Sequence, residues 1–382
     1  MAASFFFMFS TMFVNPLING YAENLGANAA FAGFIVGIMS IAAMFMRPIA
    51  GNLTDMFSKY RLSFIGGILI LTGIIGYILS PSSMWLLLFR LINGTGYVLC
   101  TVCMTTWLAF LVPRSHVGEA MGFYGLMNAL SMALAPALAI NIYPVVGYRK
   151  SLFAAAFASL LMVVAIQFVE NKSTPIKKDN SVRSGNKKAK HHFKIIQMNV
   201  LPVAILTTLF ALPYFTTQAD IVTYVAQRHV KVNVGFYFLI YAVVLLIIRI
   251  ALKRYFDTVR FGVWFWISLI ATAFYIFMLY FMHNDWQMAF AAGGMAMGYG
   301  IIYSVLQSTA LLLAPISEQG LASSTFYLGL DIGMALGPIL GGYVDSVLPV
   351  KYFYLVELVL IPLILIVYLL YARKLNSAID NH

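Results

Sequence analysis

The sequence predicts an all-α integral membrane protein of twelve transmembrane helices, arranged as two pseudo-symmetric six-helix bundles. First, 62% of the 382 residues are hydrophobic and 10% are charged, whereas soluble domains carry about 25% charged residues. Second, the apolar residues occur in runs of about 20, the length that a helix needs to cross a bilayer core about 30 Å thick. Third, the chain repeats itself at a constant offset. Together these observations exclude a soluble globular domain.

The internal repeat is visible in the rarest helix landmarks, which recur 202 residues apart without a gap. The pairs are Gly33 with Gly235, Arg47 with Arg249, Asp55 with Asp257, Gly96-Tyr97 with Gly298-Tyr299, Pro113 with Pro315, Gly118 with Gly320, and Pro136 with Pro338. A constant offset over such a length indicates two copies of one unit. Because each copy contains six spans, an even number, both copies enter the membrane from the same side and the repeats are parallel.

Twelve apolar runs mark the expected spans and divide the chain into domains. They lie near residues 3–21, 30–51, 62–80, 84–111, 118–141, 150–169, 195–218, 233–252, 261–281, 286–313, 320–343 and 352–372. We expect an N-terminal bundle over residues 1–169, a basic linker over 170–194 and a C-terminal bundle over 195–382. The linker has the composition of a solvated tether, and its basic residues are expected to touch anionic lipid.

Lys and Arg are distributed unequally between the two sets of loops. If the N-terminus is cytoplasmic, the linker cluster and most other basic residues fall on the inner side. The outer loops then carry only Arg149, Lys150, Arg228, Lys231 and Lys351. The positive-inside rule therefore predicts that both termini lie in the cytoplasm. The net charge of +11 reflects these orientation signals and lipid headgroup contacts, which argues against nucleic-acid binding.

Polar and aromatic residues recur at helical spacing on single faces of six expected spans. The candidate binding residues are Asn15, Asn19, Arg90, Asn93, Tyr97, Tyr124, Asn128, Tyr214, Gln218, Tyr299, Tyr303, Gln307, Tyr327 and Asp331. Because polar side chains avoid lipid, these faces are expected to surround a small-molecule site between the halves. The alternative is that they only form hydrogen bonds between helices.

Two charges lie inside expected spans, Arg90 and Asp331, where each costs about 3 kcal/mol unless it is paired or hydrated. Asp331 lies two residues from both Gly329 and Gly333, which are expected to pack closely against another helix. Asp331 is therefore expected to point away from these glycines and into the cavity. The first half has no acid at mid-membrane depth. Asp331 is therefore the first candidate for a proton carrier and Asp220 the next. Desolvation is expected to raise the pKa of such an acid toward the working range, unless Arg90 lies close enough to hold it ionised.

Asp55 is expected at the cytoplasmic membrane edge, where it can meet Arg114 and the partly positive start of the eleventh span near Gly320. By the repeat, Asp257 can meet the start of the fifth span near Gly118. Such contacts would form when the cytoplasmic side is closed, which makes them candidates for a gate latch. The alternative is simple ordering of a loop.

The segment from Gly51 to Arg61 reads GNLTDMFSKYR, which resembles the G-x-x-x-D-R-x-G-R-R/K signature of the major facilitator superfamily. Arg47-Pro48 before it resembles the drug-efflux branch, and Arg90 to Gly96 is similar to the R-x-x-Q-G-x-G element of that branch. Met56, Ser58 and Asn93 depart from these patterns. The glycine–proline element of antiporters is degenerate in the fifth span and fuller in the eleventh. The resemblance covers the whole chain and implies a gating role for Gly51 and Asp55.

The resemblance implies a secondary active transporter of the cell membrane that works by alternating access. Proton-coupled efflux of a small amphipathic or apolar compound, by a monomer, is the first expectation. The alternatives are an uptake symporter or facilitator for a small organic acid, sugar or peptide-like solute, and a membrane sensor that does not transport. The chain shows no phosphate loop or catalytic triad, and Cys100 and Cys103 have no ligand partners nearby. We therefore expect no enzyme activity, no cofactor and no metal.

Overall fold

The computed structural model describes residues 1–169, 193–252 and 255–380, so most of the predicted linker, residues 170–192, lies outside the described residues. Every regular element in these ranges is helical. Twelve of the helices in the described part of the chain are long and apolar enough to cross a membrane. The predicted all-α membrane fold with twelve spans is therefore confirmed.

The N-terminal bundle contains six long helices. They are α1 (Ala2–Asn24), α2 (Ala29–Met56), α3 (Lys59–Leu79), α4 (Ser83–Leu111), α5 (Val117–Val146) and α6 (Tyr148–Gln167), with the 3-10 turn η1 (Arg114–His116) before α5. Its core is formed by buried apolar residues, among them Phe7, Phe13, Leu17, Ile74 and Leu152. The opposite sides of these helices carry large exposed apolar residues such as Phe45 and Phe157, as expected for a surface that faces lipid.

The C-terminal bundle repeats this order with more interruptions. Its helices are α7 (Leu201–Gln227), α8 (Val234–Ala251), α9 (Tyr255–Thr258), α10 (Phe261–Tyr280), α11 (Asp285–Met295), α12 (Ile301–Leu313), α13 (Gln319–Val347), α14 (Phe353–Glu357) and α15 (Leu360–Asp380). The π turn η2 (Ala296–Gly300) joins α11 to α12, and the 3-10 turns η3 (Ile316–Glu318) and η4 (Val350–Tyr352) precede α13 and α14.

The predicted start of the seventh span at residue 195 is wrong, because α7 begins at Leu201. The apolar run does begin earlier, but Gln197 interrupts it: its backbone N–H donates to Thr325 and its side-chain oxygen accepts from the N–H of Asn199. These bonds turn the chain across the end of α13 before the helix starts. The helix also continues to Gln227, beyond the predicted end at residue 218.

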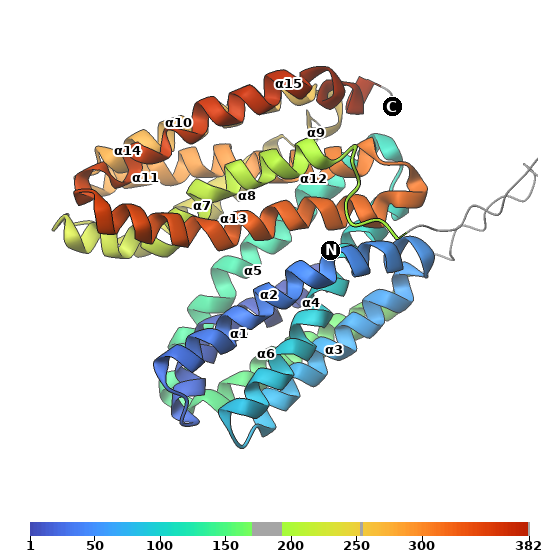
Figure 1. The fold of residues 1–382 in the computed structure, drawn as a ribbon, viewed down its shortest axis with the longest axis vertical. Helices are drawn as coiled ribbons and strands as arrows, with labels where there is room; N and C mark the ends of the chain where they lie inside the picture. Colours follow the sequence, from blue (N-terminus) through green and yellow to red (C-terminus); the bar gives the residue numbers. More distant parts are fainter. Residues whose placement is uncertain (170–192, 253–254, 381–382) are drawn as a thin grey trace, which may run out of the picture.

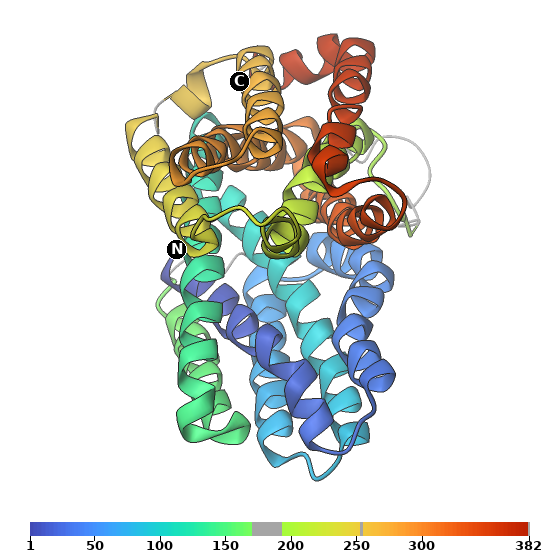
Figure 2. The same ribbon diagram turned by 90° about the vertical axis from the view of Figure 1, so that its left-hand side faces the viewer.

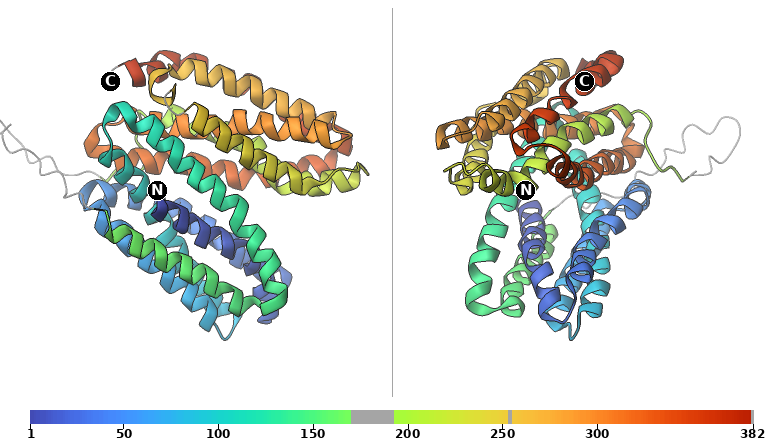
Figure 3. Two further views of the ribbon diagram at one scale, coloured as in Figure 1. Left: turned by 180° about the vertical axis from the view of Figure 1, so that it is seen from behind. Right: turned by 60° about the vertical axis from the view of Figure 1, so that its left-hand side comes forward.

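The two bundles meet on one side of the molecule and diverge toward the other (Figures 1 and 3). We call the side on which the described chain resumes at residue 193 the linker face. The contacts between the bundles run along two interfaces. At the α2–α13 interface these two helices pack together, and at the α5–α8 interface α5 packs on α8, α9 and α12. Figure 2 shows the same two bundles from the side. The repeat seen in the sequence thus appears as two related interfaces.

Candidate functional site

At the linker face, the Asp55 carboxylate accepts hydrogen bonds from two backbone N–H groups in the first turn of α13. The distances are 2.6 Å to the Gly320 nitrogen and 3.0 Å to the Leu321 nitrogen. These N–H groups have no partner inside their own helix and carry the positive end of its dipole, so a carboxylate is favoured there. Asp55 also interacts electrostatically with Lys59. Arg114, expected beside Asp55, lies in η1 at the same face.

The same arrangement recurs at the α5–α8 interface. The Asp257 carboxylate accepts from the N–H groups of Gly118 at 2.6 Å and Glu119 at 3.0 Å, in the first turn of α5. Burial raises the pKa of Asp257, while the two N–H groups and His116 act in the opposite direction. The structure therefore contains two matched helix-end contacts, one from each repeat, at the positions that the sequence suggested.

Both helix-end contacts need glycine on the helix that donates the N–H groups. A Cβ atom on Gly320 would lie 2.6 Å from the Gly51 carbonyl oxygen and 2.8 Å from Asp55 Oδ1. A Cβ atom on Gly118 would lie 2.5 Å from the Phe256 carbonyl oxygen and 2.7 Å from Asp257 Oδ1. Gly51 itself packs against the backbone of α13. These close approaches explain why glycine recurs at these positions of the repeat.

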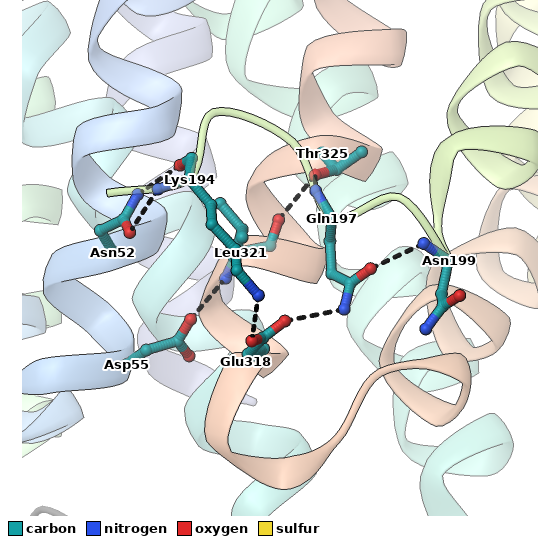
Figure 4. Close-up of polar contacts among 8 residues, drawn as sticks. All are labelled: Asn52, Asp55, Lys194, Gln197, Asn199, Glu318, Leu321 and Thr325. Atoms are coloured by element: carbon teal, nitrogen blue, oxygen red, sulfur yellow. Dashed lines mark hydrogen bonds and ion pairs between the residues drawn. The ribbon is translucent and has the colours of Figure 1, made fainter. Parts of the chain in front are cut away.

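The segment from residue 193 to 200 crosses the α2–α13 interface, and Figure 4 shows its contacts. Asn52 of α2 donates to the carbonyl oxygen of Lys194 at 2.7 Å and accepts from its backbone N–H at 3.3 Å. On the other side, Glu318 accepts from the Lys194 side chain at 2.6 Å and from the Gln197 side chain at 2.8 Å. We call residues 193–200 the strap. The strap ties the end of α2 to the start of α13.

Deeper in the α2–α13 interface lies a buried ion pair between the bundles. The Arg47 guanidinium donates to both oxygens of Asp331, with Nε–Oδ2 at 2.7 Å and Nη2–Oδ1 at 3.1 Å. The relative exposure of the two side chains is 0% and 2%. Arg47 also donates to the Thr101 hydroxyl on α4. A two-bond arginine–carboxylate pair of this kind is among the stronger polar contacts available to a protein.

A ring of hydroxyl and aromatic groups surrounds this ion pair. The Arg47 guanidinium lies over the ring of Tyr327 at 4.7 Å and over that of Tyr97 at 5.7 Å. The Tyr327 hydroxyl lies 2.9 Å from the Thr105 hydroxyl of the other bundle, and it accepts from the Gln307 side chain at 2.9 Å. Tyr97, Gln307, Tyr327 and Asp331 therefore do converge between the bundles.

The other aromatic candidates of the second half form a cluster beside this ring. Tyr214 stacks on Tyr299 with ring centroids 4.0 Å apart, and Tyr299 contacts Tyr303 at 6.0 Å. Gln218 donates to the Tyr214 hydroxyl at 2.9 Å. On α5, Tyr124 and Asn128 are 1% and 5% exposed. Among the described residues, neither amide atom of Asn128 has a hydrogen-bond partner. The packed polar surface therefore continues from α13 across α12 to α5.

Other candidates of the N-terminal half make their contacts within the N-terminal bundle. Asn93 is buried and donates to the Ile70 carbonyl oxygen of α3 at 3.2 Å, so the prediction that it lines the space between the bundles is wrong. Its side chain satisfies helix packing inside the N-terminal bundle instead. Arg90 donates to Asn15 of α1 at 3.0 Å, and Asn19 is exposed and donates to Glu23 at 3.2 Å.

Arg47, and not Arg90, holds both oxygens of Asp331. The missed residue is therefore Arg47. The repeat had marked its position, but the identity of its partner depends on how two helices from different bundles are rotated. Asp220, the second carrier candidate, lies on α7 against Gly341 of α13, and it interacts electrostatically with Glu357.

No group of three or more His, Cys, Asp and Glu side chains in the described ranges could hold a metal ion. Cys100 and Cys103 are buried free thiols of α4. The chemistry that the arrangement offers is therefore that of an ion pair, hydroxyl groups and aromatic rings at an interface that holds two bundles together.

Comparison with known proteins connects this arrangement to a family. The sequence profile of the Major Facilitator Superfamily matches residues 1–279 and 262–380. The inner membrane transport protein YajR of Escherichia coli is 24% identical over 89% of this chain and 75% of its own length. A multidrug resistance efflux pump PmrA homolog of Lactococcus lactis is 25% identical over 44% of this chain and 41% of its own length.

Among solved structures, the superfamily transporter FucP in the outward conformation superimposes with a TM-score of 0.72 at 13% identity, covering 96% of each chain. The profile, the relatives and the fold all concern membrane transporters rather than enzymes. This chain belongs to the Major Facilitator Superfamily and is a multi-pass, small-molecule transporter of the cell membrane that works by alternating access.

Proposed function

We propose that this protein exports a small amphipathic compound from the cytoplasm in exchange for protons, with Asp331 as the proton carrier. The observation that carries the proposal is the buried ion pair between Arg47 and Asp331, which joins the two bundles. Protonation of Asp331 removes one charge of the pair and weakens the link between the bundles. A proton can therefore control whether they separate.

The linker face is the cytoplasmic side in this proposal. The excess of Lys and Arg in the loops on that side supports this orientation. The two helix-end contacts then act as latches on a closed cytoplasmic gate, while the bundles diverge toward the outside (Figure 1). In this proposal the arrangement corresponds to an outward-facing state in which Arg47 and Asp331 are paired.

The order of events follows from the ion pair. A proton entering from outside neutralises Asp331, the pair with Arg47 weakens, and the cytoplasmic side can open. Substrate then binds from the cytoplasm, and Asp331 releases its proton there. The re-formed pair draws α13 back onto α2, which closes the cytoplasmic side and exposes the substrate to the outside. Proton entry and substrate exit are thus coupled through one carboxyl group.

The aromatic surface beside the pair supports an amphipathic substrate. Tyr214, Tyr299 and Tyr303 present flat apolar rings with polar hydroxyl tips, which suits ligands that combine both characters. The similarity to an efflux pump homolog in less than half of the chain agrees with export. The buried pair itself favours coupling, since an uncoupled facilitator has no need of an ionisable link between its bundles.

The test uses inside-out membrane vesicles, in which export appears as uptake into the lumen. Fluorescent amphipathic dyes of cationic, neutral and anionic type are offered with the lumen acidified. We expect the parental protein to accumulate at least one dye and Asp331→Asn to lose this gradient-driven accumulation while retaining dye exchange. Asp345→Asn, on the same helix, is the matched control and should behave as the parent. Gradient-driven accumulation by Asp331→Asn at the parental rate would refute the role of Asp331.

A further inference from the structure

Arg249 on α8 is a buried guanidinium without a carboxylate partner among the described residues. Its relative exposure is 2%, and it donates to the Gly300 carbonyl oxygen and the Ser304 hydroxyl through Nη2. Its Nε and Nη1 atoms are buried and have no hydrogen-bond partner within residues 1–169, 193–252 and 255–380. A buried charge that is neither paired nor fully hydrogen-bonded is costly to a folded protein. Its presence therefore calls for a ligand.

The internal repeat shows which partner Arg249 lacks. Arg249 occupies the position of Arg47 in the second copy, 202 residues later. The residue that corresponds in the same way to Asp331 is Ala129 on α5. One interface therefore supplies an acid for its arginine, whereas the other offers a methyl group. An anion from outside the chain would complete the second site as Asp331 completes the first.

The surroundings of Arg249 offer hydrogen-bond donors and an aromatic wall. Its guanidinium lies over the Phe256 ring at 5.0 Å, and it interacts electrostatically with Tyr241 and Tyr303. Guanidinium N–H and phenol O–H groups beside a flat ring suit an aromatic or otherwise apolar compound that carries a negative group.

We propose that Arg249 binds the anionic group of the transported compound, a carboxylate or sulfonate on an amphipathic organic molecule. This proposal rests on the function proposed above and names its substrate class. In the present state, the glycines of α5 cover the guanidinium: a Cβ atom on Gly122 would lie 3.3 Å from Nη1, and one on Gly125 would lie 3.4 Å from Nη2. When α5 moves away, Arg249 becomes accessible from the linker face.

The position of Arg249 next to the helix-end contact of α5 also explains how the bound anion is released. Gly118, which makes the helix-end contact with Asp257, lies one helical turn from Gly122 on α5. Opening this contact uncovers the guanidinium to the cytoplasm, and closing it returns α5 over Arg249. The anion is then displaced from Arg249 as the cytoplasmic gate closes, and it leaves toward the outside.

Equilibrium dialysis of the purified full-length protein near neutral pH tests the proposal. The probes are naphthalene-2-carboxylate, naphthalene-2-sulfonate and the neutral naphthalene-2-carboxamide, with inorganic sulfate as competitor. We expect the two organic anions to bind at least about tenfold more tightly than the amide, and sulfate to compete weakly. Arg249→Gln should lose this preference, and Arg249→Lys should retain part of it. Arg373→Gln, on the exposed surface of α15, should bind as the parent does.

Equal binding of all three probes to the parent, or an unchanged anion preference in Arg249→Gln, would overturn the proposal. Competition by sulfate as strong as by the naphthalene anions would show a small-anion site and would also overturn it. Vesicle transport separates this failure from failure of the proposed function. If Arg249→Gln and the parent accumulate the same dyes in response to a pH gradient, proton-coupled export stands and the anion site falls.

Discussion

The two interfaces between the bundles share one construction at the linker face. Asp55 and Asp257 each accept from two first-turn N–H groups, at 2.6 and 3.0 Å in both cases. Deeper inside, the interfaces differ. Arg47 is paired with Asp331, whereas Arg249 has no carboxylate partner among the described residues. The repeat has thus kept the helix-end contact in both copies and a carboxylate partner for the arginine in only one. In the proposed function, this difference assigns the proton to the α2–α13 interface.

The largest effect is expected from breaking the paired interface. Asp331→Leu leaves Arg47 charged and buried, which should destabilise the protein by about 3–5 kcal/mol. The double variant Arg47→Met/Asp331→Leu removes both charges and should recover most of this loss. Arg249→Met, in contrast, removes an unpaired charge and should be neutral or stabilising. Thermal unfolding in detergent measures all three. A loss of several kcal/mol in Arg249→Met would contradict this prediction and show that the contacts with Gly300, Ser304 and Phe256 are enough to stabilise the buried charge.

A second substitution makes the interfaces alike. Ala129→Asp places a carboxylate at the position that corresponds to Asp331, where it can pair with Arg249. Hydrogen bonds to charged groups contribute about 1.5–3 kcal/mol, so this pair should hold the linker face closed and slow transport at least about tenfold. Vesicle transport and unfolding temperature are the measurements. Slow transport without added stability would indicate misfolding rather than a new ion pair, and Ala129→Asn is the uncharged control.

The helix-end contacts should respond equally to substitution. Asp55→Asn and Asp257→Asn each remove the negative charge at a helix start, an effect of about 1 kcal/mol. Each variant should therefore shift the equilibrium toward an open linker face by roughly fivefold. In the double variant the two free-energy changes should add, because the two contacts share no residue.

Spin-label distances across each interface report these shifts. Met56 and Ile316 are exposed positions for the α2–α13 interface, and Ser115 and Tyr255 for the α5–α8 interface. Opening of one interface by its own variant while the other stays closed would show that the bundles do not move as rigid bodies. A distance change in only one of Asp55→Asn and Asp257→Asn would contradict the prediction that the two helix-end contacts are equivalent.

The smallest effect is expected from the strap. Lys194→Ala removes an exposed ion pair with Glu318, and such pairs contribute about 0–1 kcal/mol. Asn52→Ala removes two hydrogen bonds to the strap backbone and should have the larger effect of the two. The spin-label distance at the α2–α13 interface measures both. Raising the salt concentration should reproduce the effect of Lys194→Ala but not that of Asn52→Ala.

Much of the fold could be predicted because it depends on local properties of the chain. Span length, Lys and Arg counts and the 202-residue repeat are properties of the sequence itself. The helix-end contacts were also predictable, since Asp55 and Gly320 each mark the end of a helix. The partner of Asp331 was not, because residues 284 positions apart meet only through the rotation of two helices. Asn93 was misplaced for the same reason: helical spacing defines a face but not its neighbour.

The close packing of α13 on α7 has a mechanical consequence. Gly329 and Gly333 allow the two backbones to touch, and Thr208 and Thr216 of α7 donate across to carbonyl oxygens of α13. Hydrogen bonds at two levels oppose sliding of one helix along the other. We therefore expect α7 and α13 to tilt together, as one unit, when the contact at Gly320 opens.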